Sequence, residues 1–389
     1  MKSEVISFFY DFNCIADKCR DNCCRSWNLI VDEETVKKYK RIPGKRGFFY
    51  RLSIRKSPGG GYVLRAPFSR CVHQDKCGLC RLQRNGEEEC LPRVCRLFPR
   101  YTVSYGGYEI GIIDLACEEA AGLFLRQTGR IGFIDSRATL DIYWKIDEAD
   151  RDFASVLRKD LDLILDHIYS GDGKNIWELQ KDVFAHIYAE HLLLVRNELK
   201  NPEETGFDRE TLVNEHYGEL TWILQERFKS IYNGLPVIPF SFVNEFVYRE
   251  FSDLYLLLYH PKAFKLFRKY KRHFGKIRES EADKIFTDRL KELFVRYDWL
   301  EEKLTNYYAY KLQTFYVGAS VDYYLIEPVS LAAFCCEFLV LLLLTYTYRK
   351  DAEFDMNVFA WLISENDRLI SHNVSFRERI MKRMREKLF

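Results

Sequence analysis

Residues 12–39 read FNCIADKCRDNCCRSWNLIVDEETVKKY, and this stretch sets the character of the N-terminal part of the chain. It holds four cysteines with the spacing Cys14-x4-Cys19-x3-Cys23-Cys24. The same density continues in residues 71–80, CVHQDKCGLC, and in residues 90–95, CLPRVC, and it ends at Cys117. Thiolates this dense favour a metal site, because a metal neutralises them and orders a segment that has little core of its own.

The residues before the first cysteine bear on the compartment. The sequence MKSEVISFFYDFN has no apolar run long enough for a signal-peptide core and no small-residue cleavage site. We therefore expect a cytoplasmic protein, in which a cysteine cluster is metal-binding or catalytic more often than disulfide-bonded.

The cysteine spacing favours an iron–sulfur cluster over a zinc site and excludes neither. Zinc sites are usually built from paired Cys-x2-Cys knuckles, and only Cys77 and Cys80 offer one. An iron–sulfur cluster takes its thiolates from different corners of a cube and tolerates irregular spacing better. From Lys37 to Arg100 the chain holds 17 Lys and Arg against 4 Asp and Glu. This excess suits a negatively charged cluster, and a solvated basic face is the alternative.

Composition limits the remaining classes. The chain is 47% hydrophobic and 30% charged over 389 residues, a balance typical of a folded protein rather than of a disordered one. Its net charge of +2 argues against a polybasic nucleic-acid binder.

The patterns along the chain predict two parts. In the first part we expect a helix over residues 32–41, hairpins over 49–64 and 101–110, and a helix over 118–127. The second part shows three- and four-residue apolar spacing. There we expect helices over residues 150–169, 175–200, 212–232, 243–258, 283–315, 329–348 and 354–389, the last one broken near His372. The prediction is an α+β protein with a cysteine-rich module at residues 1–130 and a mostly all-α domain at residues 131–389.

Residues 329–348, VSLAAFCCEFLVLLLLTYTY, are nearly long enough to span a membrane. Glu337 lies near the centre of this stretch, where a lone carboxylate in lipid would be costly. A buried central helix is therefore the favoured interpretation.

At this point the motifs resemble the bacterial flagellin lysine-N-methylase family. The resemblance rests on residues 12–39, on Cys71-x8-Cys80-Arg-Leu-Gln, on Leu91-Pro-Arg-Val-Cys95-Arg96-Leu-Phe-Pro-Arg100 and on Cys117-Glu-Glu-Ala-Ala. It returns at Asn306-Tyr-Tyr-Ala-Tyr and at Ile370-Ser-His372-Asn, so it covers essentially the whole chain. The cysteine signature is also similar to a broader group of zinc- or iron-chelating domains. The chain departs from the family pattern at Glu118, where the family has Pro, and Cys77 and Cys90 have no counterpart.

The resemblance implies a set of site residues. The expected metal ligands are Cys14, Cys19, Cys23, Cys24, Cys71, Cys80, Cys95 and Cys117. One cubane cluster uses at most four thiolates, so either a second metal is present or some of the eight are structural. Arg96 and Arg100 match positions beside the cysteines and are cofactor-binding candidates. Asp32 and His372 are the catalytic candidates, although Asp32 could equally be a helix cap.

The implied reaction is methyl transfer from S-adenosylmethionine to lysine ε-amines of flagellin, with a [4Fe–4S] cluster as second cofactor. The chain lacks a Gly-x-Gly motif after a strand, so a Rossmann-type donor site is not expected. We expect flagellin as the partner, and neither nucleic acid nor a membrane. Two alternatives remain: a non-enzymatic zinc- or iron-binding interaction module, and an iron–sulfur protein that acts on nucleic acid through the basic segment.

Overall fold

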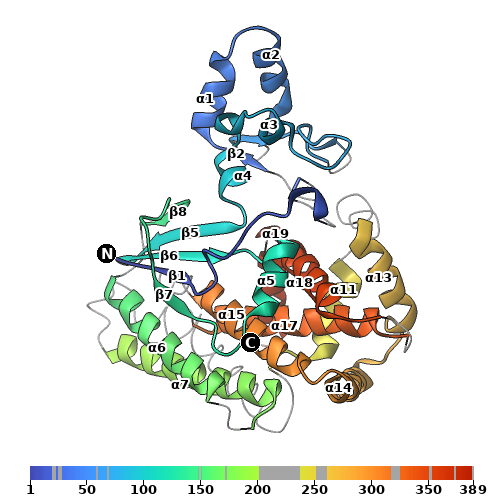
Figure 1. The fold of residues 1–389 in the computed structure, drawn as a ribbon. Coiled ribbons are helices and arrows are strands. Elements are labelled where there is room, and N and C mark those ends of the chain that lie inside the picture. Colours follow the sequence, from blue (N-terminus) through green and yellow to red (C-terminus); the bar gives the residue numbers. More distant parts are fainter. Residues whose placement is uncertain are drawn as a thin grey trace.

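The computed structural model describes most of the chain. The described residues are 1–19, 23–24, 29–57, 60–67, 70–147, 149, 151–170, 173–200, 237–250, 261–316, 325–349, 353–371 and 374–387. Within them the protein is a mixed α+β structure whose C-terminal part is helical, as predicted (Figure 1).

A five-stranded sheet occupies the centre of the N-terminal half. Its strand order is β7 (Phe133–Asp135), β1 (Lys2–Ile6), β6 (Tyr108–Ile113), β5 (Arg100–Tyr105), β8 (Trp144–Ile146). Strands β5 and β6 form the antiparallel hairpin predicted around Gly106-Gly107, where both glycines adopt positive φ angles of 48° and 89°. Strand β1 runs parallel to β6, pairing Lys2 with Tyr108 and Val5 with Gly111, and the sequence analysis did not anticipate it.

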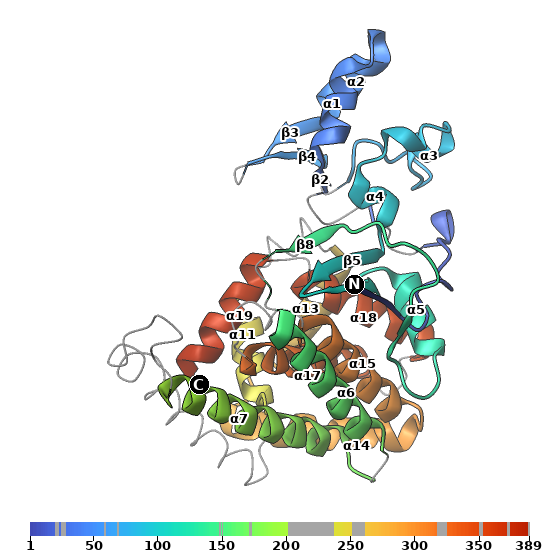
Figure 2. The ribbon, with the colours of Figure 1, turned by 90° about the vertical axis from the view of Figure 1, so that its left-hand side faces the viewer.

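A small module projects from this sheet and carries most of the cysteines (Figures 1 and 2). Its elements are β2 (Ile30–Val31), α1 (Glu33–Arg41), α2 (Gly44–Ser53), β3 (Ile54–Lys56), β4 (Tyr62–Leu64), α3 (Arg81–Arg84), η3 (Glu88–Cys90) and α4 (Arg93–Leu97). The module has its own apolar cluster, in which Tyr39 stacks on Tyr50 at 4.9 Å between ring centroids. The Tyr39 hydroxyl donates to the Cys90 carbonyl at 2.8 Å and so ties α1 to the loop before α4.

The hairpin predicted over residues 49–64 was wrong in its first half. Strands β3 and β4 pair antiparallel as expected, but the residues up to Ser53 belong to helix α2. Gly47, Tyr50 and Ser53 recur every third residue and face the core of the module, which is a helical rather than a strand period. Only glycine fits at position 47, because a Cβ there would stand 1.6 Å from the Ile42 carbonyl oxygen.

The other short predictions for this half are confirmed. Helix α1 begins after Asp32 as expected, and helix α5 (Glu118–Arg126) follows Cys117.

The C-terminal helices surround one central helix. They are α6 (Arg151–Tyr169), α7 (Ile176–Lys200), α11 (Phe240–Glu250), α13 (Pro261–His273), α14 (Glu279–Arg296), α15 (Leu300–Phe315), α17 (Ile326–Tyr346), α18 (Met356–Ile370) and α19 (Val374–Lys387). Helix α17 contacts α7, α11, α13, α14, α15, α18 and α19. In the described part of the chain it is the one helix long and apolar enough to cross a bilayer, and most of it lies inside the protein, as expected for a central helix.

Two of the helix predictions need comment. The single helix predicted over residues 283–315 is wrong, because α14 ends at Arg296 and α15 begins at Leu300. Tyr297 and Trp299 leave the helical path and pack on Phe354, with ring centroids 5.0 and 5.6 Å apart. The break predicted near His372 is confirmed, because α18 ends at Ile370, Ser371 lies in a turn, and α19 begins at Val374. The helix predicted over residues 212–232 lies outside the described residues, as does the end of the one over 243–258.

The two predicted parts share one apolar core. A single cluster runs from Val5 and Phe8 to Ile380 and Met384, and it includes side chains from β1, α5 and every C-terminal helix. The boundary near residue 130 stays a prediction, and hydrogen bonds cross it.

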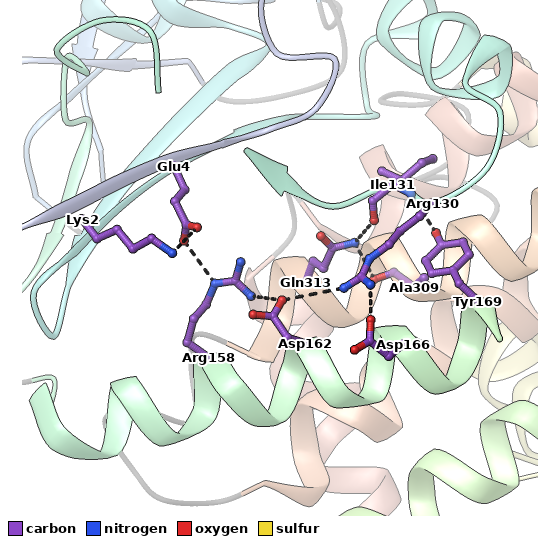
Figure 3. A network of polar contacts seen from close by, with 10 residues as sticks. All are labelled: Lys2, Glu4, Arg130, Ile131, Arg158, Asp162, Asp166, Tyr169, Ala309 and Gln313. Carbon is purple, nitrogen blue, oxygen red and sulfur yellow. Dashed lines mark hydrogen bonds and ion pairs between the residues drawn. The ribbon is translucent and has the colours of Figure 1, made fainter. Parts of the chain in front are cut away.

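Buried polar contacts reinforce this shared core (Figure 3). The Glu4 carboxylate on β1 bonds to Lys2 at 2.8 Å and to the buried guanidinium of Arg158 on α6 at 3.2 Å. Further along, the Gln313 amide on α15 donates to the Ile131 carbonyl at 3.0 Å, and the Ile131 N–H donates to the Tyr169 hydroxyl at 3.2 Å. Strand β1 is therefore fixed to α6, and the segment before β7 is fixed between α6 and α15.

Glu337 on α17 is fully buried, and burial raises its pKa to about 8. The amide of Gln180 and the indole of Trp177 lie beside the carboxyl group and oppose this shift. Neither carboxyl oxygen makes a hydrogen bond of regular geometry to any described residue. Glu337 is therefore held as the neutral acid below about pH 8.

This burial predicts a pH-dependent stability. The folded state keeps a proton on Glu337 that the unfolded state releases above its ordinary pKa of 4.5. The group therefore lowers the free energy of unfolding as pH rises from about 4.5 to 8, by on the order of 3–5 kcal/mol in total. We expect Glu337→Gln to raise the thermal unfolding midpoint by several degrees at pH 8 and much less at pH 5, measured by circular dichroism.

The matched control is Glu327→Gln on the same helix. Glu327 pairs with Arg385 at the surface, so its loss should lower the midpoint slightly and by a similar amount at both pH values. An equal gain at pH 5 and pH 8 for Glu337→Gln would contradict the assignment of a neutral buried acid.

Candidate metal centre

Five of the eight predicted ligands gather where the projecting module meets the sheet. Cys23 and Cys24 lie in a turn, Cys71 and Cys80 stand at the two ends of a short loop, and Cys95 lies on α4. The Cys71 N–H donates to the Cys24 carbonyl at 2.9 Å, and a β-bridge between Gln74 and Cys80 closes the loop. Three stretches far apart in the sequence are thereby brought together.

The thiols are close enough to influence one another's ionisation. Burial raises the pKa of Cys71 to about 11 and, together with the nearby sulfurs of Cys23, Cys71 and Cys80, holds the pKa of Cys95 well above its ordinary value. Cys24 donates a hydrogen bond to Cys23, which lowers the pKa of Cys23 and raises that of Cys24. Mutual repulsion between thiolates is what a bound cation would relieve.

Backbone N–H groups point at two of the sulfurs. Those of His73 and Gln74 lower the pKa of Cys71, although burial outweighs them. Cys117 is the N-cap of α5, and the N–H groups of Glu119 and Ala120 act on its sulfur in the same way, while burial raises its pKa to about 12. Such donors stabilise thiolates and tune the potentials of metal–sulfur sites.

The remaining predicted ligands lie around this group. Cys117 and Cys19 are both near enough to interact electrostatically with one another, and Cys117 interacts with Cys23 as well. Cys14 is exposed on the loop after Phe12. Among the described residues, no three Cys, His, Asp or Glu side chains stand ready at metal-coordinating positions. The donor set fits a thiolate-ligated metal in its chemistry, because its members are cysteines that lie near one another. Which of these cysteines are ligands stays a prediction.

The two cysteines left out of the predicted set are placed differently. Cys77 is exposed at the far side of the loop, and Cys90 is buried in the apolar cluster of the module, where the Arg46 guanidinium lies 3.8 Å from its sulfur. Cys335 and Cys336 are buried within α17, and burial raises the pKa of Cys335 to about 12.

Asp32 is a helix cap that also holds α4. Its carboxylate accepts the Thr35 N–H at 2.9 Å and the Arg93 N–H at 2.8 Å, two residues before Cys95. Partial burial favours the neutral acid, but these donors outweigh it and lower the pKa of Asp32. Through these contacts Asp32 positions α4 against α1.

The other predicted site residues are Arg100, Arg96 and His372. Arg100 is half-buried beneath the loop that leads to Cys14, where it donates to the Phe12 carbonyl at 3.0 Å and its guanidinium covers the rings of Phe9 and Phe12. Arg96 is exposed on α4. His372 lies outside the described residues.

Two residues of this region, Arg368 and His73, are absent from the predicted site. Arg368 on α18 is buried, donates to the Ala116 carbonyl at 2.8 Å beside Cys117, and lowers the pKa of Cys23. His73 is buried between the rings of Phe49 and Tyr50, and burial lowers its pKa to about 4. Neither of its ring nitrogens bonds to a described residue. Only His73 carried a sequence signal, its position two residues after Cys71.

Comparison with known proteins links the chain to the family that its motifs resemble. It is 29% identical over 125 residues to a lysine-N-methylase of Salmonella choleraesuis (strain SC-B67), a match that covers 31% of each chain. The lysine-N-methylase of Salmonella typhimurium (strain LT2) matches to the same extent. The flagellar biosynthetic protein FliU of Salmonella muenchen is 28% identical over 125 residues, which cover 31% of this chain and 74% of FliU.

The matches support a relationship to the lysine-N-methylase family. The matched stretch spans about a third of the length of the two lysine-N-methylases. No family model matches the chain, and no solved structure matches it.

The contacts of Asp32 predict a structural role. We expect Asp32→Ala to lower the free energy of unfolding by about 1–2 kcal/mol, because α1 loses its cap and α4 loses a bond to α1. Asp32→Asn keeps an acceptor oxygen and should lose less than half as much. Thermal and urea unfolding of the purified variants measure both effects.

Glu33→Ala in the first turn of α1 is the control, since Glu33 is exposed and its one ion pair to a described residue is with Lys37 at 3.8 Å. It should change the stability by less than about 0.5 kcal/mol. If Asp32→Asn were as unstable as Asp32→Ala, the helix cap would not be the source of the stability that Asp32 provides.

Proposed function

We propose that this chain is a lysine N-methyltransferase that transfers a methyl group from S-adenosylmethionine to lysine side chains of flagellin, and that its N-terminal cysteines hold an iron–sulfur cluster. The observation that carries the proposal is the 125-residue match to proteins named lysine-N-methylase. The name of FliU supports a link to the flagellum. The gathered thiols support the metal part independently.

The residues that we assign to the cluster are Cys23, Cys71, Cys80 and Cys95, because Cys95 interacts electrostatically with the other three and Cys71 with Cys23 and Cys80; Cys24 and Cys117 lie beside them. Four thiolates would saturate a cubane cluster, whereas a cluster held by three of them would leave one iron to coordinate the amino and carboxylate groups of the methyl donor. The N–H groups of His73 and Gln74 and the cation of Arg368 would offset the negative charge of the thiolates.

The chemistry of the lysine sets a further requirement. In a polar transfer the ε-nitrogen attacks the methyl carbon with its lone pair, the bond from that carbon to the sulfonium sulfur breaks, and the sulfur leaves as a neutral thioether. The attacking amine must first be neutral, so its proton has to pass to a base or be shed on desolvation. Asp32 is occupied by three donors and is poorly suited to this task. His372 remains the candidate base.

The metal part of the proposal predicts the colour and iron content of the protein. Anaerobically purified protein should be brown and contain iron and acid-labile sulfide. Replacing Cys23, Cys71, Cys80 or Cys95 by Ser should lower the iron content at least twofold in each case, because each substitution removes a thiolate from the gathered group.

The matched control is Cys77→Ser, which changes an exposed cysteine in the same loop as Cys80 and should leave the iron content unchanged. A colourless protein that carries stoichiometric zinc after anaerobic reconstitution would reject the iron–sulfur cluster. It would favour the alternative of a non-enzymatic metal-binding interaction module.

The enzymatic part predicts modified flagellin. Flagellin co-expressed with this chain should carry methylated lysines in a mass spectrum of its peptides, and flagellin co-expressed with the Cys95→Ser variant should carry far fewer. Unmodified flagellin beside cluster-loaded protein would count against the methyltransferase. Tight, salt-sensitive binding of DNA or RNA by the same protein would then favour the nucleic-acid alternative.

A further inference from the structure

Helix α2 turns an apolar face outward from the projecting module. Its inner side is Gly47, Tyr50 and Ser53, so the opposite side carries Phe48 and Leu52, which are 59% and 51% exposed. Phe49 lies at the edge of this face and touches His73, with ring centroids 5.5 Å apart. Two large apolar side chains one helical turn apart form a patch, whereas most other exposed apolar side chains in the described residues stand singly.

Positive charge surrounds this patch. Residues 37–56 hold nine Lys and Arg and no Asp or Glu. Lys45 lies on the same side of α2 as Phe48 and Leu52 and is exposed. Lys37 pairs with Glu33, and Arg46 pairs with Glu87 and Glu89.

The arginine next to the patch is held in a fixed position. Arg51 donates through Nη1 to the carbonyl oxygens of Ile42 at 3.1 Å and Tyr39 at 3.4 Å. These bonds leave its other guanidinium donors for a partner, and a guanidinium whose orientation is set in advance binds a carboxylate at a lower entropic cost.

The patch is connected to the thiol group by a short path. Tyr50, on the inner side of α2, stacks on Tyr39 and lies 6.0 Å from the ring of His73, two residues from Cys71. A partner seated on α2 would therefore be held by the same module that carries Cys71, Cys80 and Cys95 (Figure 2).

We propose that the outward face of α2, formed by Lys45, Phe48, Arg51 and Leu52, docks an acidic segment with apolar anchors on the protein substrate. The proposal rests on the proposed function for the identity of that substrate. Charge complementarity requires an acidic partner, and the apolar pair requires anchors in it. A protein fits better than a lipid surface, because the patch is small and its arginine is fixed by two carbonyls. Affinity for an anionic lipid surface instead grows with the buried apolar area and with the number of mobile basic side chains.

The test measures binding of flagellin monomers to the full-length, cluster-loaded protein by biolayer interferometry at 50 and 500 mM NaCl. The variant is Phe48→Ser/Leu52→Ser, which spares Phe49 because of its contact with His73. The control is Val156→Ser/Leu163→Ser on α6. It likewise removes two exposed apolar side chains from one helix, and these are 58% and 63% exposed. Iron content and circular dichroism of each variant report on folding.

We expect the wild-type protein and the control to bind flagellin alike, and to bind it more weakly at high salt. The α2 variant should bind at least tenfold more weakly, and Lys45→Glu should weaken binding chiefly at 50 mM NaCl. Equal binding by the α2 variant, or no binding by the wild type, would overturn the docking surface. So would binding to vesicles of phosphatidylcholine and phosphatidylglycerol that depends on Phe48 and Leu52 while flagellin binding does not.

These results separate the docking surface from the methyltransferase. Methylated flagellin with unaltered binding by the α2 variant would leave the enzyme in place and remove its docking site. Loss of binding in that variant, with no methyl transfer by the wild type, would keep the surface and remove the enzyme.

Discussion

Side chains of α15 and α18 donate hydrogen bonds to backbone carbonyls on either side of Cys117, and the arrangement of the thiols depends on these bonds. The Tyr310 hydroxyl donates to the Ile113 carbonyl and the Arg368 guanidinium to the Ala116 carbonyl, while the Lys303 ammonium donates to Gln127. All three donors are buried, so water does not compete for these carbonyls. Because the segment from β6 to α5 carries Cys117, the C-terminal helices set the position of a residue that the sequence assigns to the N-terminal module.

The same helices also bring charge to the thiols. The Arg368 guanidinium lowers the pKa of Cys23, and it is anchored beside Cys117 by its bond to Ala116. Helix α18 is held in turn by a buried ion pair, Lys311 to Asp367 at 2.6 Å, with the Tyr307 hydroxyl on the same carboxylate at 2.6 Å. Removing one partner from such a pair typically costs about 3–5 kcal/mol. The pair therefore fixes the register of α18 against α15, and with it the place of Arg368.

Local patterns in the sequence predicted the elements that interactions between neighbouring residues determine. The Asp32 cap, the Gly106-Gly107 hairpin and the break near His372 depend on a few neighbouring residues, and all three are confirmed. Strand β1 was missed because its partner β6 lies more than 100 residues away, so no short-range period marks the pairing. The start of the hairpin predicted over residues 49–64 is helical, because burial of Gly47, Tyr50 and Ser53 overrides the strand preference of Phe49 and Tyr50. The cysteine spacing predicted a thiol group but could not reveal Arg368, which reaches it only through the tertiary fold.

The motif Asn306-Tyr-Tyr-Ala-Tyr, one of the stretches that carry the family resemblance, makes several of these contacts. Within Asn306-Tyr-Tyr-Ala-Tyr, Tyr307 bonds to Asp367 and Tyr310 to the Ile113 carbonyl, so the motif joins α15 both to α18 and to the end of β6. Tyr307 and Tyr310 are buried, and burial holds their pKa values well above the ordinary range, so these two act as neutral hydrogen-bond donors. A cysteine signature alone could serve any metal-binding module. The tyrosine motif instead connects the segment that carries Cys117 to the C-terminal helices.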